Sequence, residues 1–139
     1  MCIRDRYNLR TGKKIGDLCF VIKKTDTDIF ACIRYWLIEI GFEKGLLLGP
    51  LAVRKDMQRH GLGSLLINHS LEIAKEKKFK FCFVSGESDY YPKFGFNRIK
   101  LKNLILPGAI DPERLHIIFF EEGIENKMGD KPWTVKSSN

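Results

Sequence analysis

The spacing of apolar positions predicts two adjacent strands in the first part of the chain. Apolar side chains recur at every second position of residues 18–23, which is typical of a strand with one buried face. Residues 29–40 are rich in β-branched and aromatic side chains, which favour a second strand. The polar turn at residues 25–28 predicts that the two strands pair as a hairpin.

The pattern changes after residue 45. Residues 46–53 form an apolar stretch that is broken by Gly49 and Pro50. Because proline cannot donate to a strand ladder and glycine often marks a bulge, we expect this strand to splay from a neighbour. After a polar loop, apolar residues in 62–78 recur at spacings of three, four and seven, which predicts an amphipathic helix. The short apolar run 81–84 is typical of a parallel strand covered on both faces.

These segments predict a βαβ unit inside a mixed α/β sheet. Residues 90–94 indicate one helical turn closed by Gly95, and residues 115–120 indicate a further strand. We found no internal repeat and no linker, so we interpret residues 1–139 as a single domain. Its core is expected over 18–120, followed by a mainly polar tail, 121–139.

Composition narrows the classes of function. The 139 residues carry a formal charge of +7, which favours anionic partners such as a phosphate-bearing cofactor or nucleic acid. No apolar run approaches the roughly 18 residues of a membrane span, and the first six residues lack the apolar region of a secretory signal. The four cysteines form no C-x-x-C pair, so we expect free thiols, no disulfide framework, no metal site and a cytoplasmic location.

The most informative motif lies between the strand 46–53 and the helix. It reads Gln58-Arg59-His60-Gly61-Leu62-Gly63-Ser64. The first N–H groups of a helix lack intrahelical partners, and glycines let a phosphate approach the backbone closely. Residues 54–80 also hold seven Lys/Arg against three Asp/Glu, a net of +4. The loop matches neither the dinucleotide fingerprint, which needs a third glycine where Leu66 stands, nor the Gly-Lys-Ser/Thr phosphate loop.

Two motifs together resemble a known family. The first is Gln-x-x-Gly-x-Gly after Leu-Gly-Pro-Leu-Ala-Val, and the second is Tyr91-Pro-Lys-Phe94-Gly95-Phe96, which begins 28 residues after Gly63. In this order and at this separation they resemble the GNAT superfamily of acetyl-CoA-dependent N-acetyltransferases, in particular its small bacterial members. The resemblance covers about residues 18–120, and residues 46–96 carry its specific part.

The resemblance implies an acyl-CoA N-acyltransferase fold with a splayed central sheet. It implies that acetyl-CoA is the co-substrate, with its pantetheine arm paired to the backbone of Leu51, Ala52 and Val53. The diphosphate is then expected on the loop residues Gln58, Arg59, His60, Gly61, Leu62, Gly63 and Ser64. The expected reaction is direct attack, in a ternary complex, by a primary amine of a small molecule or a protein.

Proton transfer and oxyanion binding complete the expected chemistry. Tyr91 occupies the family position of the general acid, although an aromatic packed under the following turn is an alternative, and Tyr90 is a neighbouring candidate. A backbone N–H near Ala52 or Val53 suits the oxyanion. No base stands out: Glu39 or Glu43 could relay a proton through water, and Glu87 and Asp89 could position the acceptor.

Three further interpretations remain open. The family usually begins with a strand and two helices, whereas only about 17 residues without helical periodicity precede Leu18, so we expect this part to be reduced or missing. An exposed first strand would allow homodimer formation. The alternative function is a non-catalytic acyl-CoA-binding module or a basic nucleic-acid-binding module, although no specific nucleic-acid motif is present.

Overall fold

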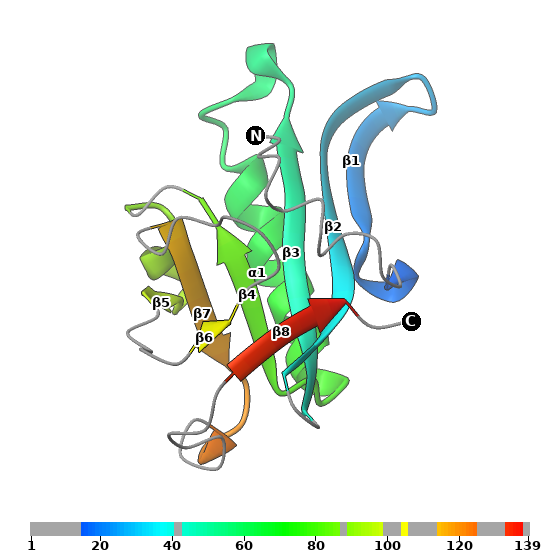
Figure 1. Ribbon diagram of the computed structural model, residues 1–139. Helices are drawn as coiled ribbons and strands as arrows, with labels where there is room; N and C mark the ends of the chain where they lie inside the picture. Colours follow the sequence, from blue (N-terminus) through cyan, green and yellow to red (C-terminus); the bar gives the residue numbers. More distant parts are fainter. Residues whose placement is uncertain are drawn as a thin grey trace.

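The chain folds around one mixed sheet, which Figure 1 shows with α1 behind it and β8 crossing in front. The computed structural model describes residues 15–40, 43–86, 89–98, 104–105, 114–124 and 133–137. The strand order in the described part is β5-β7-β4-β3-β2-β8-β6, and β1 also pairs with β2. β1 pairs with the first part of β2 and β8 with its last three residues, so both lie along the edge of β2 that faces away from β3.

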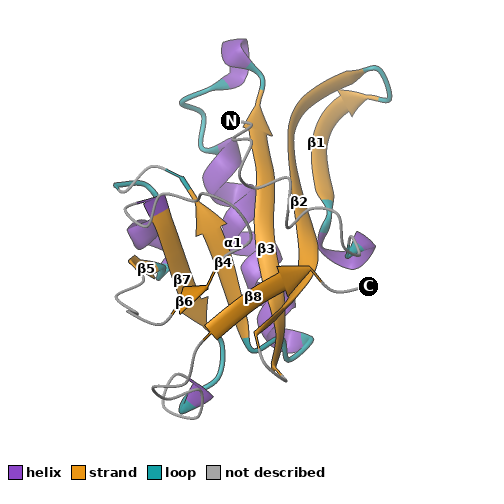
Figure 2. Cartoon of the chain, in the orientation of Figure 1, coloured by secondary structure: helices purple, strands orange, loops and turns teal. Residues whose placement is uncertain are grey.

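The elements have the following bounds. The strands are β1 Phe20–Thr25, β2 Asp28–Ile40, β3 Glu43–Val53, β4 Phe81–Ser85, β5 Asn97–Arg98, β6 Leu104–Ile105, β7 Leu115–Phe119 and β8 Trp133–Ser137. The α-helix is α1 Leu62–Glu76, and the 3-10 turns are η2 Gly16–Leu18, η3 Lys55–Met57 and η4 Tyr91–Phe94. Figure 2 shows how the single long helix lies along the sheet.

The sheet buries apolar side chains on both of its faces. Alternate residues of β3 and β4, such as Leu46 and Cys82, face α1 and join one core cluster. Their neighbours Leu47 and Phe83 face the other way and pack in a second cluster with Val135 of β8. All five residues of β4 are buried, as expected for a parallel strand covered on both sides.

A buried hydrogen bond joins α1 to the sheet. The hydroxyl groups of Tyr35 and Ser70 lie 2.6 Å apart, and Ser70 Oγ in turn donates to the carbonyl of Leu66 at 2.6 Å. Burial raises the pKa of Tyr35 well above its ordinary value. This polar contact fixes the position of the helix on the sheet, because a buried hydroxyl without a partner would be costly.

β3 and β4 run parallel but separate early. They pair only at Leu46 with Cys82 and at Leu47 with Phe83, although both strands continue beyond these pairs. β3 remains paired with β2 as far as Val53. The expected splay of this strand from a neighbour is therefore confirmed, and the neighbour is β4.

The expected bulge is also confirmed. Between Ile33 and Tyr35, β2 advances two residues, whereas β3 advances three, from Leu51 to Leu48. The extra residue falls at the Gly49–Pro50 step. Trp36 Nε1 donates to the carbonyl of Gly49 at 2.7 Å, which holds the irregular segment against β2.

Several boundaries differ from those predicted. The first strand begins at Phe20 rather than residue 18, because Leu18 lies buried in η2. The helix ends at Glu76, two residues before the predicted end. β8 lies in the segment expected to be a polar tail, and its Val135 is only 2% exposed. The expectation of a reduced N-terminal part concerns residues 1–14, which lie outside the described residues.

Candidate functional site

A cavity of about 630 Å³ opens at the carboxyl end of β3. One wall is the end of β3, a second is the glycine loop with the first turn of α1, and a third is the segment around η4. The lining residues are Leu51, Ala52, Val53, Met57, Gln58, Arg59, Gly61, Leu62, Gly63, Ser64, Asp89, Tyr90, Tyr91 and Lys93. The cavity therefore lies where β3 has already separated from β4.

The first turn of α1 presents its backbone N–H groups to this cavity. Gly61 is the N-cap, has a φ of 77° and makes no side-chain cap. A Cβ atom at Gly61 would meet nothing within 4 Å, so open space lies beside the cap. Uncapped N–H groups and the helix dipole make this position suitable for an anion. The loop also brings Arg59 to the cavity wall, with a φ of 69°.

The backbone of β3 has a free edge in the cavity. Arg54 N donates to the carbonyl of Phe30 at 2.8 Å, so these two residues stand at a hydrogen-bonded position of the β2–β3 ladder. In antiparallel strands, hydrogen-bonded residue pairs alternate with pairs that are not hydrogen-bonded. Ala52 is therefore the next residue of β3 that is bonded to β2. The backbone N–H and carbonyl groups of Leu51 and Val53 point away from β2. The carbonyl of Val53 accepts from Gln58 Nε2 at 3.2 Å, which agrees with this direction.

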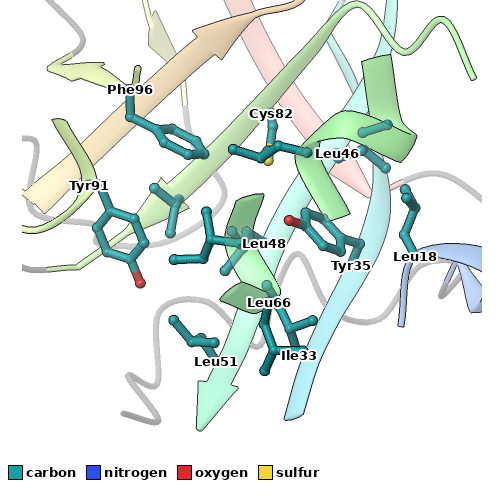
Figure 3. Close-up of a cluster of buried hydrophobic side chains, with 14 of the residues drawn as sticks. Leu18, Ile33, Tyr35, Leu46, Leu48, Leu51, Leu66, Cys82, Tyr91 and Phe96 are labelled. Atoms are coloured by element: carbon teal, nitrogen blue, oxygen red, sulfur yellow. The ribbon is translucent and has the colours of Figure 1, made fainter. Parts of the chain in front are cut away.

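Tyr91 lines the cavity from within the core. Its side chain is 1% exposed, and its ring packs against the rings of Phe96 and His116, with centroid distances of 5.8 and 6.1 Å. Figure 3 shows the ring beside Leu48, with the hydroxyl directed toward the end of β3 that carries Leu51. The packing fixes the ring in place, and the hydroxyl oxygen is itself buried beside the cavity that the residue lines.

Tyr90 lies on the outer side of the same turn. Its half-buried ring makes edge contacts with Tyr91 and Phe94, each at a centroid distance of 5.2 Å. Its hydroxyl oxygen would lie 2.8 Å from a Cβ atom at Gly63. The two neighbouring tyrosines therefore diverge, Tyr91 into the core and Tyr90 across the cavity to the first turn of α1.

His116 of β7 supports Tyr91 from behind. It is fully buried, and its Nδ1 donates to the carbonyl of Arg114 at 3.1 Å. Nε2 is buried without a hydrogen-bond partner in the described part of the chain. Burial lowers the pKa of His116, the hydrogen bond to the Arg114 carbonyl raises it less, and Arg98 lowers it further. The ring is therefore held neutral.

Arg54 closes the loop after β3 rather than facing the cavity. Its Nε and Nη2 donate to the two carboxylate oxygens of Asp56 at 2.6 and 3.0 Å, and Nη1 contacts Asp28. These bonds raise the pKa of Arg54, and the same guanidinium lowers the pKa of Asp56. The guanidinium also lies over the ring of Phe30, 4.8 Å from its centroid. The loop is thus anchored to the β1–β2 turn.

Most of the residues predicted from the sequence meet at the cavity. All of the expected binding residues line it except His60, which is exposed and not part of its wall. Sequence reasoning missed Met57 and Lys93, because an apolar loop residue and a surface lysine carry no motif. It treated Tyr90 only as an alternative acid, since local periodicity does not show which way a side chain on an isolated turn will point.

The two glutamates considered as proton relays lie elsewhere. Glu39 pairs with Lys44 and Ile40 with Glu43 at the opposite end of the β2–β3 pair. Glu43 precedes Leu51 by eight positions along β3, which corresponds to a distance of roughly 25 Å at the usual rise of a strand. The one carboxylate that lines the cavity among the described residues belongs to Asp89, which is exposed.

The described residues hold no candidate metal site and no membrane-spanning helix. No group of three or more His, Cys, Asp or Glu side chains there is arranged to hold a metal ion. None of the helices there is both long and apolar enough to span a membrane. The described cysteines, Cys19, Cys32 and Cys82, are free thiols, and burial raises the pKa of the Cys82 thiol.

Comparison with known sequences decides the family. The sequence profile of the acetyltransferase (GNAT) domain matches residues 16–98, more than half of the chain. The chain belongs to the GNAT acetyltransferase family. The family expected from the two motifs is therefore confirmed, whereas no protein of curated function matches the sequence.

Solved GNAT structures share the fold. One is the GNAT family N-acetyltransferase YhbS from Escherichia coli, in complex with CoA, with a TM-score of 0.70 and 15% identity over 84% of this chain and 64% of that one. A GNAT acetyltransferase from Staphylococcus aureus Mu50 has a TM-score of 0.58 and 16% identity, over 85% of this chain and 75% of that one. A GNAT family acetyltransferase from Brucella melitensis, in complex with acetyl-CoA, has a TM-score of 0.54 and 23% identity over 70% of this chain and 55% of that one.

These comparisons confirm the mixed α/β GNAT fold. The Escherichia coli and Brucella proteins are longer, since this chain spans 64% and 55% of their lengths.

The buried, neutral state of His116 predicts a pH dependence of stability. Because the pKa of His116 is lower in the folded chain, the unfolded chain binds more protons at this site as the pH falls through about 6.5. The free energy of unfolding should therefore fall as the pH falls. The slope can reach about 1.4 kcal/mol per pH unit. We expect His116→Gln to reduce the pH dependence of the free energy of unfolding between pH 7.5 and 5, as measured by urea unfolding. The control is His60→Gln, which replaces an exposed histidine and should keep the pH dependence of the wild type. An unchanged slope in His116→Gln would contradict this account.

Proposed function

We propose that this GNAT domain transfers an acetyl group from acetyl-CoA to a primary amine of a small molecule or a protein. The observation that carries the proposal is one continuous cavity. It runs from the free backbone edge of β3 to the uncapped first turn of α1. We also propose that residues 1–139 form one catalytic domain. The two core clusters described above lie on opposite faces of one sheet, so neither forms a separate folding unit.

The cavity suits the chemical parts of acetyl-CoA. The outward N–H and carbonyl groups of Leu51 can pair with an amide of a pantetheine arm as an added strand would. The first turn of α1 is suited to the diphosphate, because Gly61 leaves open space there. Related proteins support the choice of ligand, since the Escherichia coli and Brucella structures are complexes with CoA and acetyl-CoA.

The chain itself then contributes orientation and charge stabilisation. Acetyl-CoA supplies an acetyl group activated as a thioester, and the amine attacks it directly in a ternary complex. A backbone N–H of β3 would donate to the oxyanion that forms on the carbonyl. Of the two residues expected for this role, Val53 suits it and Ala52 does not, because Ala52 is bonded to β2.

Tyr91 is proposed as the general acid that protonates the leaving thiolate. A phenol with a pKa near 10 can supply a proton to a thiolate whose conjugate acid has a pKa near 8.5. The ring is held by Phe96 and His116, so the hydroxyl has a fixed position beside the cavity. Asp89 lines the same cavity and is proposed to position the incoming amine.

The positive charge does not favour the nucleic-acid alternative. At least five of the fifteen Lys and Arg residues in the described part of the chain form ion pairs, which weakens them as part of a continuous phosphate-binding surface. These pairs are Lys23 with Asp26, Arg54 with Asp28, Lys77 with Asp17, Lys80 with Glu121 and Lys136 with Glu39. By contrast, Arg59 and Lys93 line the cavity.

A cytoplasmic location and a homodimer complete the proposal. The free cysteines of the described part favour a reducing compartment. Among the described strands, β1 pairs only with β2, so its outer edge is the surface that a second copy would use.

The diphosphate placement predicts the effect of Gly61→Glu. The new carboxylate would lie in the open space beside the α1 cap and repel the diphosphate, weakening acetyl-CoA binding by at least about a hundredfold. Calorimetric titration measures this. Gly61→Asn is the matched control, because asparagine tolerates a positive φ and carries no charge, and it should lose far less affinity. A Gly61→Glu variant with the titration heat of the wild type would refute the placement.

The proposed acid predicts a separate effect of Tyr91→Phe. The change removes only the hydroxyl, so turnover should fall by about a hundredfold while the acetyl-CoA dissociation constant stays within about twofold. Turnover is scored as free thiol release over a panel of amines, and the dissociation constant is measured by calorimetry. Unchanged turnover would exclude Tyr91 as the acid.

A further inference from the structure

The Tyr90 hydroxyl occupies a position that the proposed reaction does not explain. It lies across the cavity from its own turn, against the second residue of α1, Gly63. A Cβ atom at Gly63 would meet the Tyr90 oxygen at 2.8 Å, but Val53 and Leu51 only at 3.7 and 3.8 Å. The phenol is therefore the group that comes nearest to this face of the glycine.

The ring of Tyr90 is held while its polar end stays in the cavity. Tyr91 and Phe94 make edge contacts with the ring at interplanar angles of 83° and 67°. Lys93 Nζ lies 5.6 Å from the ring centroid, over its face. A cation over the face draws electron density from the ring and favours the hydroxyl as a hydrogen-bond donor. Such a donor suits an anion better than it suits an apolar ligand.

The position of the hydroxyl relative to α1 indicates which part of a ligand it would meet. The N–H groups of the first turn bind an anion from one side only, and a phosphate has oxygens left on its other side. The Tyr90 oxygen lies against that turn at Gly63, on the flank where side-chain atoms of Val53 and Leu51 also come near. From this flank it can reach the remaining oxygens of a phosphate held by the N–H groups. Lys93 and Arg59 bring positive charge to the same cavity.

We propose that the Tyr90 hydroxyl is a diphosphate donor, which hydrogen-bonds the diphosphate of acetyl-CoA from the flank of the first turn of α1, beside its N–H groups. This inference rests on the proposed acetyl-CoA site and adds a residue to it. The two adjacent tyrosines then have different tasks. Tyr90 binds the anionic end of the cofactor, and Tyr91 acts on the sulfur.

Binding of ADP and acetyl-CoA to Tyr90→Phe tests the proposal. The substitution keeps the ring and its contacts with Tyr91 and Phe94, so it removes only the donor. Hydrogen bonds to charged groups are the strong ones, and we expect both ligands to bind about tenfold more weakly. Binding of acetyl-pantetheine, which lacks the diphosphate, should stay unchanged. Tyr91→Phe is the matched control and should leave ADP affinity unchanged.

A double-mutant cycle tests the geometry independently of catalysis. Gly63→Ala places a methyl carbon 2.8 Å from the Tyr90 oxygen, so the hydroxyl must shift and ADP binding should weaken in the otherwise wild-type protein. In the Tyr90→Phe background the hydroxyl is already absent, and the two losses should be clearly less than additive. Fully additive losses would contradict the contact between Tyr90 and the first turn.

The outcomes separate this inference from the proposed function. If the wild type binds acetyl-CoA and ADP but Tyr90→Phe binds ADP equally well, the role of Tyr90 is refuted and the acetyl-CoA site stands. If Tyr90→Phe loses turnover at unchanged ligand affinity, Tyr90 is the acid and the assignment is likewise wrong. If the wild type binds neither ligand, both the site and the inference fail.

Discussion

The cavity depends on the different pairing of β3 with its two neighbours. β3 keeps its antiparallel register with β2 through to Val53, but it leaves parallel β4 after two residue pairs. The extra residue at the Gly49–Pro50 bulge lets the strand change course, and the bond from Trp36 to the Gly49 carbonyl holds it against β2. As a result, the polar groups of Leu51 and the N–H of Val53 face the cavity instead of another strand, while the Val53 carbonyl accepts from Gln58. A strand edge inside a protein needs a partner, and here that partner can be a ligand.

α1 turns this opened edge into a directed site. The helix is fixed to the sheet by apolar burial and by the bond between Tyr35 and Ser70, so its first turn has a set position beside the end of β3. An edge that pairs with amides and a helix end that attracts an anion then lie in one cavity. η4 adds the third wall, where Tyr91 is held by the core and Tyr90 extends across the opening.

Much of this arrangement could be predicted from the sequence because it rests on local chemistry. Gly49–Pro50 interrupts an apolar strand, Gly61 and Gly63 stand at a helix start, and the run 81–84 is apolar on both faces. β8 could not be predicted, since its buried Val135 is surrounded by polar residues and gains its apolar contacts only from the second core. The directions of Tyr90 and Tyr91 depend on the packing of Phe94, Phe96 and His116, which lie on different elements.

The central claim is that the free edge of β3 and the first turn of α1 bind acetyl-CoA together. Hydrogen–deuterium exchange of the amides, with and without acetyl-CoA, tests it most directly, because these N–H groups have no backbone partner in the free protein. The account predicts slower exchange at Leu51, Val53 and residues 62–64 on binding, with no change along β1. Acetyl-CoA binding that leaves these amides unprotected, or that protects another face of the sheet, would contradict it.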